Sequence, residues 1–592
     1  MTSSSSAPPR RPVRIANCSG FYGDRLAAAR EVVEGGPIDV LTGDYLAELT
    51  MLILWKARQK DPDAGYARTF LTQLEDVLGT CLDRGIKIVS NAGGLNPAGL
   101  AAQIGVLAQR LGLAPKVAHV HGDDVLPRLP EMLADGVDLA HLDTGQRLAD
   151  AGVEPVSANA YLGGWGIAAA LEAGADVVVT GRVTDASLVV GPAAWWHGWA
   201  RTDWDAVAGA VAAGHVIECG PQACGGNYSF LDEVTDRRYP GFPIAEVAAD
   251  GSSVITKHDD TGGLVSIGTV TAQLLYEIDS PTYANPDVVA DFGTVELTQQ
   301  APDRVLLSGT RGSAPSDQLK VAFNHLGGYR NTMTLVLTGL DVEEKAAWAT
   351  EELFDILGGR DSFADTDVQL LRFDTTDAPT NAHATAHLRV TVKDPDRRTV
   401  GRRFSDATMQ LALGGYAGFH TTTPPTAESA YGVYWPALVP RDRVEHVVVL
   451  PDGTSQPVPH SPSGPGPAPA SPPVREVRAT EPTVRVPLGR VVGARSGDKG
   501  GNANVGLWAR DDDTWAWVAS TLTVDVFREL LPEAAGLAVR RFELPRLRAL
   551  NFVVVGLLGE GVASATRPDP QAKGLGEYLR SRTLEVPVRL LR

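Results

Sequence analysis

The chain has 592 residues, of which 44% are hydrophobic and 21% charged, as is typical of a soluble globular protein with more than one core. Its formal charge of −18 argues against nucleic acid or an anionic membrane as the main partner, because both require clustered Lys and Arg. Four cysteines, at positions 18, 81, 219 and 224, are too few for a disulfide framework and favour a reduced, cytoplasmic setting. No segment approaches the run of about eighteen apolar residues that a membrane helix needs.

The first part of the chain alternates short apolar runs with amphipathic stretches. Residues 1–12 lack the apolar run of a signal peptide and are predicted to form a disordered tail. Residues 13–238 are predicted to form a layered α/β lobe with a mainly parallel sheet, and a barrel is the alternative. The expected strands are Val13–Asn17, Ile38–Leu41, Ile86–Val89, Lys116–Val120 and Asp176–Thr180. The expected helices are Asp24–Val33, Thr69–Arg84, Leu100–Leu111 and Ile167–Ala173.

The pattern changes after residue 238, where alternating strand-like segments predominate. Residues 239–452 are predicted to form an α+β second lobe. The expected strands are Ser253–Thr256, Leu264–Val270, Val305–Leu307, Met333–Leu337, Leu388–Val392 and Val447–Leu450. The expected helices are Val342–Leu357 and Ser405–Leu413.

The last part of the chain begins with residues 453–483, which are rich in Pro, Ser, Gly and Ala and are predicted to be a linker. Residues 484–592 are predicted to form a small α+β domain. Its expected strands are Val484–Val492, Val505–Ala509, Ala516–Ala519, Arg541–Leu544 and Phe552–Leu557. Its expected helices are Val524–Leu531 and Gln571–Arg582.

Four glycine-containing loops follow the first four predicted strands. In open α/β sheets, ligands bind beyond the carboxyl ends of the strands, where helix N-termini favour anions. The candidate ligand-binding residues of these loops are Ser19, Gly20, Gly23, Asn91, Gly93, Gly94 and Asn96. The third loop is the best formed, because Asn96 is a good N-cap and Pro97 a good first helical residue. The alternative is that the glycines only permit tight turns.

Carboxylates and one histidine of the same loops are candidates for acid–base catalysis. The predicted catalytic residues are Asp24, Asp44, His121 and Asp123, with Glu48 and Asp124 beside them. The alternative for Asp24 and Asp44 is that they cap helices. His119 and His121 share one face of a strand, but without a third ligand they do not predict a metal site.

Two further segments carry candidate residues. Arg182 follows the fifth strand and could grip a carboxylate or phosphate, or pair structurally with Asp185. Cys219 is a candidate nucleophile with His215 as its only local base, although two buried structural cysteines are the alternative. Gly225, Gly226 and Asn227 are predicted to form a backbone anion site.

The segment from Ala494 to Asn504 holds three glycines, charges of both signs and two amides. It is predicted to be a loop that presents Arg495, Lys499 and Asn502 either to a ligand or to a neighbouring subunit, and assembly is favoured because a long linker precedes it. No segment has Walker or dinucleotide-binding spacing, so no nucleotide cofactor is predicted.

Several of these motifs together resemble the acyclic terpene utilisation family AtuA. The similar segments are Asn17–Asp24, Gly43–Glu48, Asn91–Pro97, Gly181–Asp185, Gly220–Asn227 and Arg495–Asn504. The resemblance covers nearly the whole chain and implies a long AtuA domain followed by a ferredoxin-like domain. It also implies a role in bacterial catabolism of acyclic terpenoids such as citronellol and geraniol, through branched acyl-CoA thioesters. It implies no role for any single residue.

Two functions follow as hypotheses. The first is a lyase, hydratase or hydrolase that acts on a branched acyl-CoA or related carboxylate, with coenzyme A as part of the substrate. The second is a non-catalytic subunit that binds acyl-CoA or assembles with other pathway enzymes. In both cases a small-molecule ligand and a homo-oligomer formed through the C-terminal domain are expected, without nucleic acid or membrane.

Overall fold

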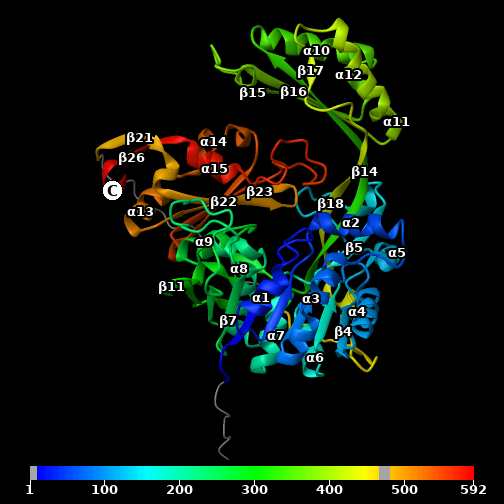
Figure 1. The fold of residues 1–592 in the computed structure, drawn as a ribbon, viewed down its shortest axis with the longest axis vertical. Helices are drawn as coiled ribbons and strands as arrows, with labels where there is room; N and C mark the ends of the chain where they lie inside the picture. The colour runs from blue at the N-terminus through cyan, green and yellow to red at the C-terminus, as the bar shows by residue number, and fades with distance from the viewer. Residues whose placement is uncertain (1–9, 466–480, 592) are drawn as a thin grey trace, which may run out of the picture. The chain divides into compact units, whose positions relative to one another are not determined.

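The computed structural model describes residues 10–465 and 481–591, and the chain forms two compact units. The first unit comprises residues 1–324, 434–562 and 571–592, and the second comprises residues 325–433 and 563–570. Most of the predicted N-terminal tail and the middle of the predicted linker lie outside the described residues. Figure 1 labels the helices and strands of both units.

The first unit is built around an eleven-stranded sheet of order β11-β12-β8-β7-β1-β2-β3-β6-β4-β19-β20. The five central strands are parallel, and both flanks are antiparallel. The parallel strands are β1 (Val13–Asn17), β2 (Val40–Gly43), β3 (Lys87–Ser90), β6 (Val177–Thr180) and β4 (Val117–His121). The flanking strands are β7 (Pro243–Val247), β8 (Ser253–Lys257), β11 (Glu296–Ala301), β12 (Arg304–Ser308), β19 (Val447–Val449) and β20 (Ser455–Pro457). The layered sheet with parallel strands is therefore confirmed, and it is open rather than a barrel.

Helices cover both faces of this sheet, because successive strand residues point to opposite sides. One face packs with α1 (Ala28–Gly35), α3 (Arg68–Arg84) and α4 (Pro97–Leu111) through one apolar core. The other packs with α5 (Leu129–Ala134), α6 (Trp165–Glu172), α7 (Ser187–His197), α8 (Trp204–Ile217) and α9 (Ile267–Leu274). Helix α2 (Glu48–Arg58) has a small apolar cluster of its own, made of Leu46, Met51, Leu54 and Leu95.

Strand β5 (Pro155–Ala160) pairs with β14, and a three-stranded antiparallel sheet joins β9 (Thr282–Ala284), β10 (Val289–Asp291) and β13 (Arg311–Ser313). Residues 239–452 thus share strands of the large sheet with residues 13–238. The predicted boundary between the two lobes remains a prediction.

The second unit is an antiparallel sheet covered by helices. Its strands are β15 (Asp365–Arg372), β16 (Thr385–Asp394), β17 (His420–Thr421) and parts of β14 (Gln318–Thr338) and β18 (Ser429–Pro440), both of which continue into the first unit. Its helices are α10 (Val342–Ile356), α11 (Arg397–Val400) and α12 (Arg402–Gly414). Met333, Leu353 and Phe404 belong to its apolar core.

The C-terminal domain has its own apolar core, which includes Phe527, Phe552 and Leu579. It has a four-stranded antiparallel sheet of order β22-β23-β25-β24, and β21 pairs with β26. The strands are β21 (Thr483–Pro487), β22 (Val492–Lys499), β23 (Asn502–Ala509), β24 (Val539–Leu544), β25 (Ala549–Val554) and β26 (Thr583–Pro587). The helices are α13 (Asp512–Thr521), α14 (Val524–Leu530) and α15 (Leu575–Ser581). The small α+β domain is confirmed.

Two predicted strands are helices in the structure. Leu264–Val270 leads into α9, where Ser266 and Thr269 form a reciprocal capping box. Ala516–Ala519 lies in α13, which Asp511 caps by accepting a hydrogen bond from the Thr514 N–H. In both cases the apolar run is too short to reveal its period, and the cap decides the structure.

The segment from Ala494 to Asn504 is a β-hairpin, so the predicted loop is wrong. Strands β22 and β23 pair up to Lys499 and Asn502, and only two glycines form the turn. Gly500 has a φ of +62°, which a glycine adopts without strain. Short two-residue turns of this kind are the preferred connections of β-hairpins.

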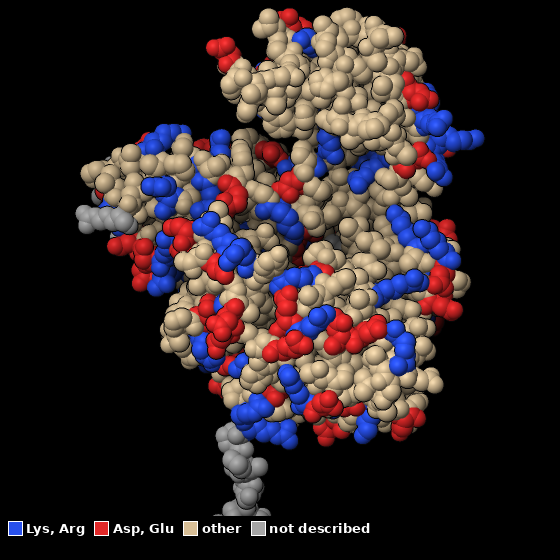
Figure 2. All heavy atoms as spheres, in the orientation of Figure 1, with Lys and Arg blue, Asp and Glu red and all other residues tan. Residues whose placement is uncertain are grey.

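No helix among the described residues combines the length and the apolar character that crossing a bilayer requires. On the face shown in Figure 2, Lys and Arg side chains are mixed with Asp and Glu rather than gathered into one basic patch.

Candidate functional site

The carboxyl ends of the five parallel strands meet at one edge of the sheet, and the loops there carry most of the predicted site residues. The structure brings some of these residues into two neighbouring groups in the first unit, and the others lie outside both groups. We call the first the β4 pocket, lined by Gly94, Leu95, Pro97, His121, Gly122, Asp123, Asp124, Val125, Arg128, Arg443 and Glu445. We call the second the polar cluster, made of Asp44, Arg182, Asp185, His215, Glu218, Cys219, Glu277, Lys499 and Lys573.

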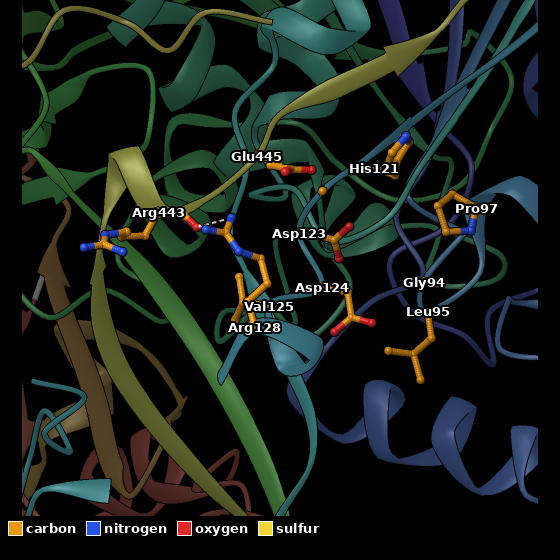
Figure 3. Close-up of a pocket in the computed structure, with 11 residues that line it drawn as sticks. Gly94, Leu95, Pro97, His121, Asp123, Asp124, Val125, Arg128, Arg443 and Glu445 are labelled. Atoms are coloured by element: carbon orange, nitrogen blue, oxygen red, sulfur yellow. Dashed lines mark hydrogen bonds between the residues drawn. The ribbon is translucent and has the colours of Figure 1, made fainter. Parts of the chain in front are cut away.

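The β4 pocket is a cavity of about 220 Å³, and Figure 3 shows Asp123, Asp124 and Glu445 around it. Asp123 is only 3% exposed. Its Oδ2 accepts hydrogen bonds from the Arg182 N–H and from Asn159 Nδ2, each at 2.8 Å. Burial nevertheless raises the pKa of Asp123 to about 7, since these two bonds only partly offset the loss of hydration. The pocket therefore holds a carboxyl that can gain or lose a proton near neutral pH.

Arg182 joins the two groups. Its backbone contacts Asp123, while its Nη1 lies 2.6 Å from Asp185 Oδ1 and its guanidinium 4.3 Å from the ring centroid of Tyr161. Burial opposes the charge, but Asp185, Tyr161 and Asp44 outweigh it, and the pKa of Arg182 is raised. Arg182 is thus a permanent buried cation, and the ion pair with Asp185 is present.

Asp44 follows β2 and is 5% exposed. Its Oδ1 accepts from Asn91 Nδ2 at 2.6 Å, and the Asn91 side chain in turn accepts from the Tyr45 N–H. Burial raises the pKa of Asp44 well above its usual range, and the nearby carboxylates of Asp185 and Glu218 raise it further. Asp44 does not cap α2, whose N-cap is Ala47. Nothing is described of the Glu48 side chain.

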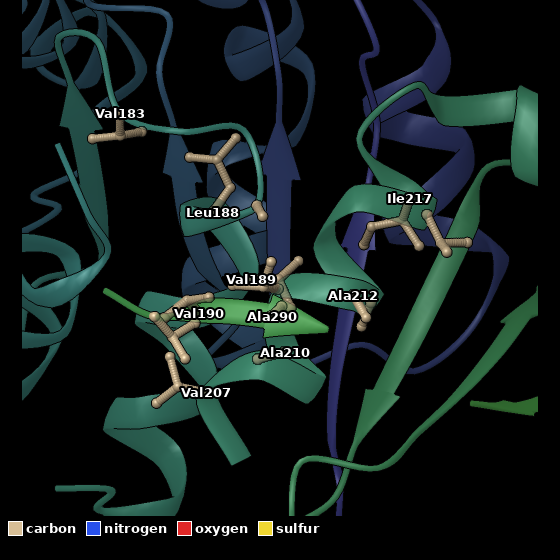
Figure 4. Packing of buried hydrophobic residues seen from close by; sticks show 14 of the residues in the cluster. Val183, Leu188, Val189, Val190, Val207, Ala210, Ala212, Ile217 and Ala290 are labelled. Carbon is tan, nitrogen blue, oxygen red and sulfur yellow. The ribbon is translucent and has the colours of Figure 1, made fainter. Parts of the chain in front are cut away.

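The C-terminal end of α8 delivers His215 and Glu218 to the polar cluster. The rest of this helix is made mostly of Ala, Val and Gly, and Figure 4 shows Val207 of α8 beside Val190 of α7. His215 Nδ1 lies 3.1 Å from Glu218 Oε1, one turn away, and the imidazole packs 4.9 Å from the ring of Tyr283. Burial and the nearby Lys499 lower the pKa of His215 to about 4. The imidazole is therefore neutral at physiological pH.

Glu218 is 9% exposed, and its Oε2 has no hydrogen-bond partner within the protein. Burial raises the pKa of Glu218 well above its usual range, and the charges of Asp185 and Glu277 add to the effect. The next residue, Cys219, feels the same environment, because burial, Glu218 and Glu277 raise the pKa of its thiol. Cys219 lies in the polar cluster as a neutral thiol, so its surroundings do not support a nucleophilic role.

The C-terminal domain supplies the other cations. Lys573 Nζ lies 3.1 Å from Glu277 Oε1, and Lys499 lies 5.6 Å from the ring centroid of Tyr283. Burial opposes ionisation of Glu277, but Lys573, the Tyr276 hydroxyl and Lys499 outweigh it and lower the pKa of this carboxyl. Glu218 and Glu277 are thus neighbouring carboxyls whose surroundings move their pKa values in opposite directions.

Arg495 and Asn502, two further predicted ligand-binding residues, contact residues of the 1–324 part of the same unit that lie outside the polar cluster. Arg495 donates to Gln222 and stacks 4.3 Å from the ring of Tyr276. Asn502 Nδ2 donates to Asp143 Oδ1 at 2.7 Å, and its Oδ1 accepts from the Gly556 N–H. Ligand binding by these two residues remains a prediction.

The loop after β1 packs against Cys219, and ligand binding by Ser19, Gly20 and Gly23 remains a prediction. Asp24 accepts from the N–H groups of Gly20 and Arg25, and α1 begins after Ala27, so Asp24 does not cap it. A side chain on Gly20 would lie 2.7 Å from the Cys219 carbonyl carbon. The Ser19 hydroxyl donates to the Phe21 carbonyl within the same loop, and Gly23 lies against the Phe21 ring.

In the predicted backbone anion sites, most N–H groups donate to backbone carbonyls of the protein itself. Asn96 caps α4 as predicted, but the N–H groups of Gly94, Leu95 and Asn96 donate to the carbonyls of Asn91, Gly65 and Gly93. Gly93 packs closely, since a side chain there would lie 2.7 Å from Pro97 Cβ. The N–H groups of Gly225 and Gly226 both donate to the Pro221 carbonyl, and Asn227 has a φ of +57°. Anion binding by either loop remains a prediction.

Three residues of the polar cluster are absent from the sequence-based candidates: Glu218, Glu277 and Lys573. Glu218 could have been predicted from the sequence, because a His and a Glu one turn apart end an otherwise apolar helix. Glu277 and Lys573 come from segments distant in sequence and have no such signal. Among the described residues, no three His, Cys, Asp or Glu side chains are arranged to hold a metal ion.

Comparison with protein families identifies two regions. Residues 13–450 match the acyclic terpene utilisation family protein AtuA, and residues 486–585 match the AtuA ferredoxin-like domain. The chain belongs to the AtuA family. None of the curated proteins compared with it matches. For this AtuA protein, the matches support a role in acyclic terpene utilisation and confirm that the C-terminal domain is ferredoxin-like.

Proposed function

We propose that this AtuA protein is a lyase that adds or removes water at a branched acyl thioester or related carboxylate of acyclic terpenoid catabolism. The observation that carries the proposal is the pairing of Glu218 with Glu277. Enzymes that need an acid and a base at one pH obtain them by moving the pKa values of two neighbouring groups apart. Glu218 keeps its proton because it is buried among carboxylates, and Glu277 stays ionised because two lysines face it.

In the dehydration direction, the Glu277 carboxylate removes the proton on the carbon next to the carbonyl. The electron pair forms the carbon–carbon double bond, and the hydroxyl on the following carbon leaves with the proton of Glu218 as water. Exchange with solvent then returns both carboxyls to their starting states. Hydration is the reverse sequence.

The cations of the polar cluster support the same reaction. Arg182 and Lys499 are placed to stabilise the negative charge that develops on the carbonyl oxygen, or to hold a substrate carboxylate. Glu218 Oε2 is a buried acceptor without a partner in the protein, and such atoms are rare unless a ligand or water satisfies them. Hydrolysis through Cys219 has less support, because its thiol is neutral.

We place this reaction in the cytoplasm, since all four cysteines are free. Coenzyme A as part of the substrate is also proposed, as is a homo-oligomer.

The experiment is a thermal-shift screen with branched 2-enoyl-CoA and 3-hydroxyacyl-CoA thioesters, followed by turnover of the best ligand. The expected result is reversible hydration that Glu218→Gln and Glu277→Gln each reduce by roughly a hundredfold or more, with ligand binding kept. A matched control is Glu233→Gln, which alters a partly buried carboxylate that is salt-bridged to Arg510 and accepts from the Tyr228 hydroxyl. Binding without turnover in the native protein would instead favour the non-catalytic subunit.

A further inference from the structure

The backbone at Glu277 is unusual. Glu277 has a φ of +55°, a left-handed conformation that residues other than Gly, Asn and Asp rarely adopt. It lies in the turn that follows α9, where glycine is the residue that usually takes this conformation. Such conformations persist only when surrounding contacts impose them, and they concentrate at functional sites.

The contacts that impose it come from one face of the C-terminal sheet. Asn504 Oδ1 accepts from the Glu277 N–H at 2.8 Å, and Asn551 Nδ2 donates to the Ile278 carbonyl at 3.0 Å. The two asparagines also hydrogen-bond each other, and both are fully buried. Consecutive backbone groups of the Glu277–Ile278 segment are therefore held by two side chains of neighbouring strands.

The same face is shaped for this segment. In β22 and β23, Gly497 pairs with Asn504, and Gly506 pairs with Asn551 across β23 and β25. A side chain on Gly497 would lie 3.2 Å from Glu277 Cγ, and one on Gly506 would lie 3.1 Å from Leu275 Cδ1. The two glycines thus leave room for residues 275–277, and the two asparagines fix their backbone.

We infer that Asn504 and Asn551 of the C-terminal domain are positioning residues, which set the backbone of Glu277 so that its carboxylate faces Lys573 and Glu218. This inference rests on the proposed function for the role of Glu277 as the base. It assigns the C-terminal domain a task within the active site of its own chain. The domain contributes to the site in two ways: it supplies Lys499 and Lys573, and it fixes the backbone of Glu277, the proposed base.

Several titratable groups face Glu277 from the elements around it. Lys573 and Lys499 come from the C-terminal domain, Glu218, Cys219 and His215 from the end of α8, and Tyr276 from its own segment. If the hydrogen bonds of Asn504 and Asn551 are lost, Glu277 moves away from the lysines while burial continues to oppose its charge. Its pKa should then rise, and the acidic limb of the pH–rate profile should move to higher pH.

The test compares Asn504→Ala and Asn551→Ala in the full chain, so that one variant remains if the other fails to fold. The control is Ser229→Ala, since the Ser229 hydroxyl hydrogen-bonds Ala494 of the same domain without touching Glu277. Two readouts need no substrate. The first is hydrogen exchange of the peptide containing the Glu277 amide, and the second is an infrared titration of the carboxyl band that disappears in Glu277→Gln.

Both asparagine variants should show at least tenfold faster exchange at Glu277 and a carboxyl titration moved to higher pH, whereas the control should show neither. With turnover available, kcat/KM at low pH should fall on the order of tenfold to a hundredfold. Unchanged exchange, or faster exchange with an unchanged titration, would overturn the inference. Absence of turnover in the native protein would overturn the proposed function alone, because the two substrate-free readouts still decide the positioning role.

Discussion

His215 Nδ1 lies 3.1 Å from Glu218 Oε1 at the end of α8, yet the two groups lack the angles of a hydrogen bond. The imidazole is neutral, because its pKa is lowered to about 4, and the pKa of the carboxyl is raised. The surroundings therefore favour the uncharged form of both groups. Deprotonating Glu218 would place a charge in a nearly inaccessible site, beside Asp185 and Glu277.

Replacement of Glu218 by Gln should make stability less dependent on pH. A carboxyl with a raised folded-state pKa binds protons more tightly in the folded protein, so the native chain should lose stability as pH rises above the unfolded-state pKa of about 4.3. Glutamine cannot lose a proton, and the variant should gain stability relative to the native protein between pH 5 and 8. Urea unfolding at several pH values measures this difference. An unchanged difference across that range would show that Glu218 is ionised in the folded state.

Asp123 offers a second test with a defined window. Its pKa is raised from 3.8 to about 7 by burial, so its ionisation should cost up to about 4 kcal/mol of folding stability, lost between about pH 4 and pH 7. Asp123→Asn keeps an acceptor for Arg182 and Asn159 and should remove this dependence. The variant should therefore be more stable than the native protein at pH 8 but not at pH 4. Urea unfolding at several pH values measures this difference. If the free energy of unfolding depends on pH equally in the two proteins, the raised pKa is contradicted.

The parallel part of the fold is well predicted from sequence, because its strands are short apolar runs that end in glycine-containing turns. Strand Val13–Asn17 was predicted with its observed bounds, and α3 differs by one residue from the predicted Thr69–Arg84. The sequence from Ala494 to Asn504 predicts a loop rather than the observed hairpin, because one strand face carries Arg495, Gly497 and Lys499 instead of apolar residues. That face meets another polar segment of the protein, so hydrophobic alternation is absent where the strand is buried.

Asp44 and Arg182 are predicted because each follows directly after a strand, and Cys219 and Lys499 because their segments combine glycines with polar residues. Asp44 and Arg182 are close to strand ends, and the parallel arrangement brings them together. Glu277 depends on a strained backbone and on side chains more than 200 residues away. No periodicity or spacing in the sequence encodes such a contact.

Arg182 and Asp185 should behave as a coupled buried pair. Arg182→Gln leaves Asp185 without its ion-pair partner and should destabilise the protein by roughly 3–5 kcal/mol. Adding Asp185→Asn should recover part of this loss, because it removes the uncompensated charge. A double-mutant cycle by urea unfolding measures the coupling. Additive losses would mean that the two side chains act independently.

Cleavage within residues 456–483 should leave the two fragments associated. Pro-rich sequences of this kind are common targets for proteases, but Ser229, Glu277 and Ile278 hydrogen-bond the C-terminal domain directly. The nicked protein should elute at the mass of the intact chain and separate only in denaturant. Release of the C-terminal fragment in native buffer would show that the interface is too weak to complete the site.

Lys499→Ala should impair ligand binding or turnover without changing the oligomeric mass of the protein. In the structure Lys499 faces Tyr283 and is close enough to lower the pKa values of both Glu218 and Glu277, so it belongs to the site of its own chain. Loss of a charge-assisted contact of this kind costs roughly 1.5–3 kcal/mol, or about ten- to a hundredfold in affinity or kcat/KM. The control is Arg485→Ala, which removes an exposed cation from β21 of the same domain. Light scattering measures the oligomeric mass, and turnover assays measure activity. If the oligomeric mass changes in Lys499→Ala but not in Arg485→Ala, this lysine belongs to a subunit interface instead.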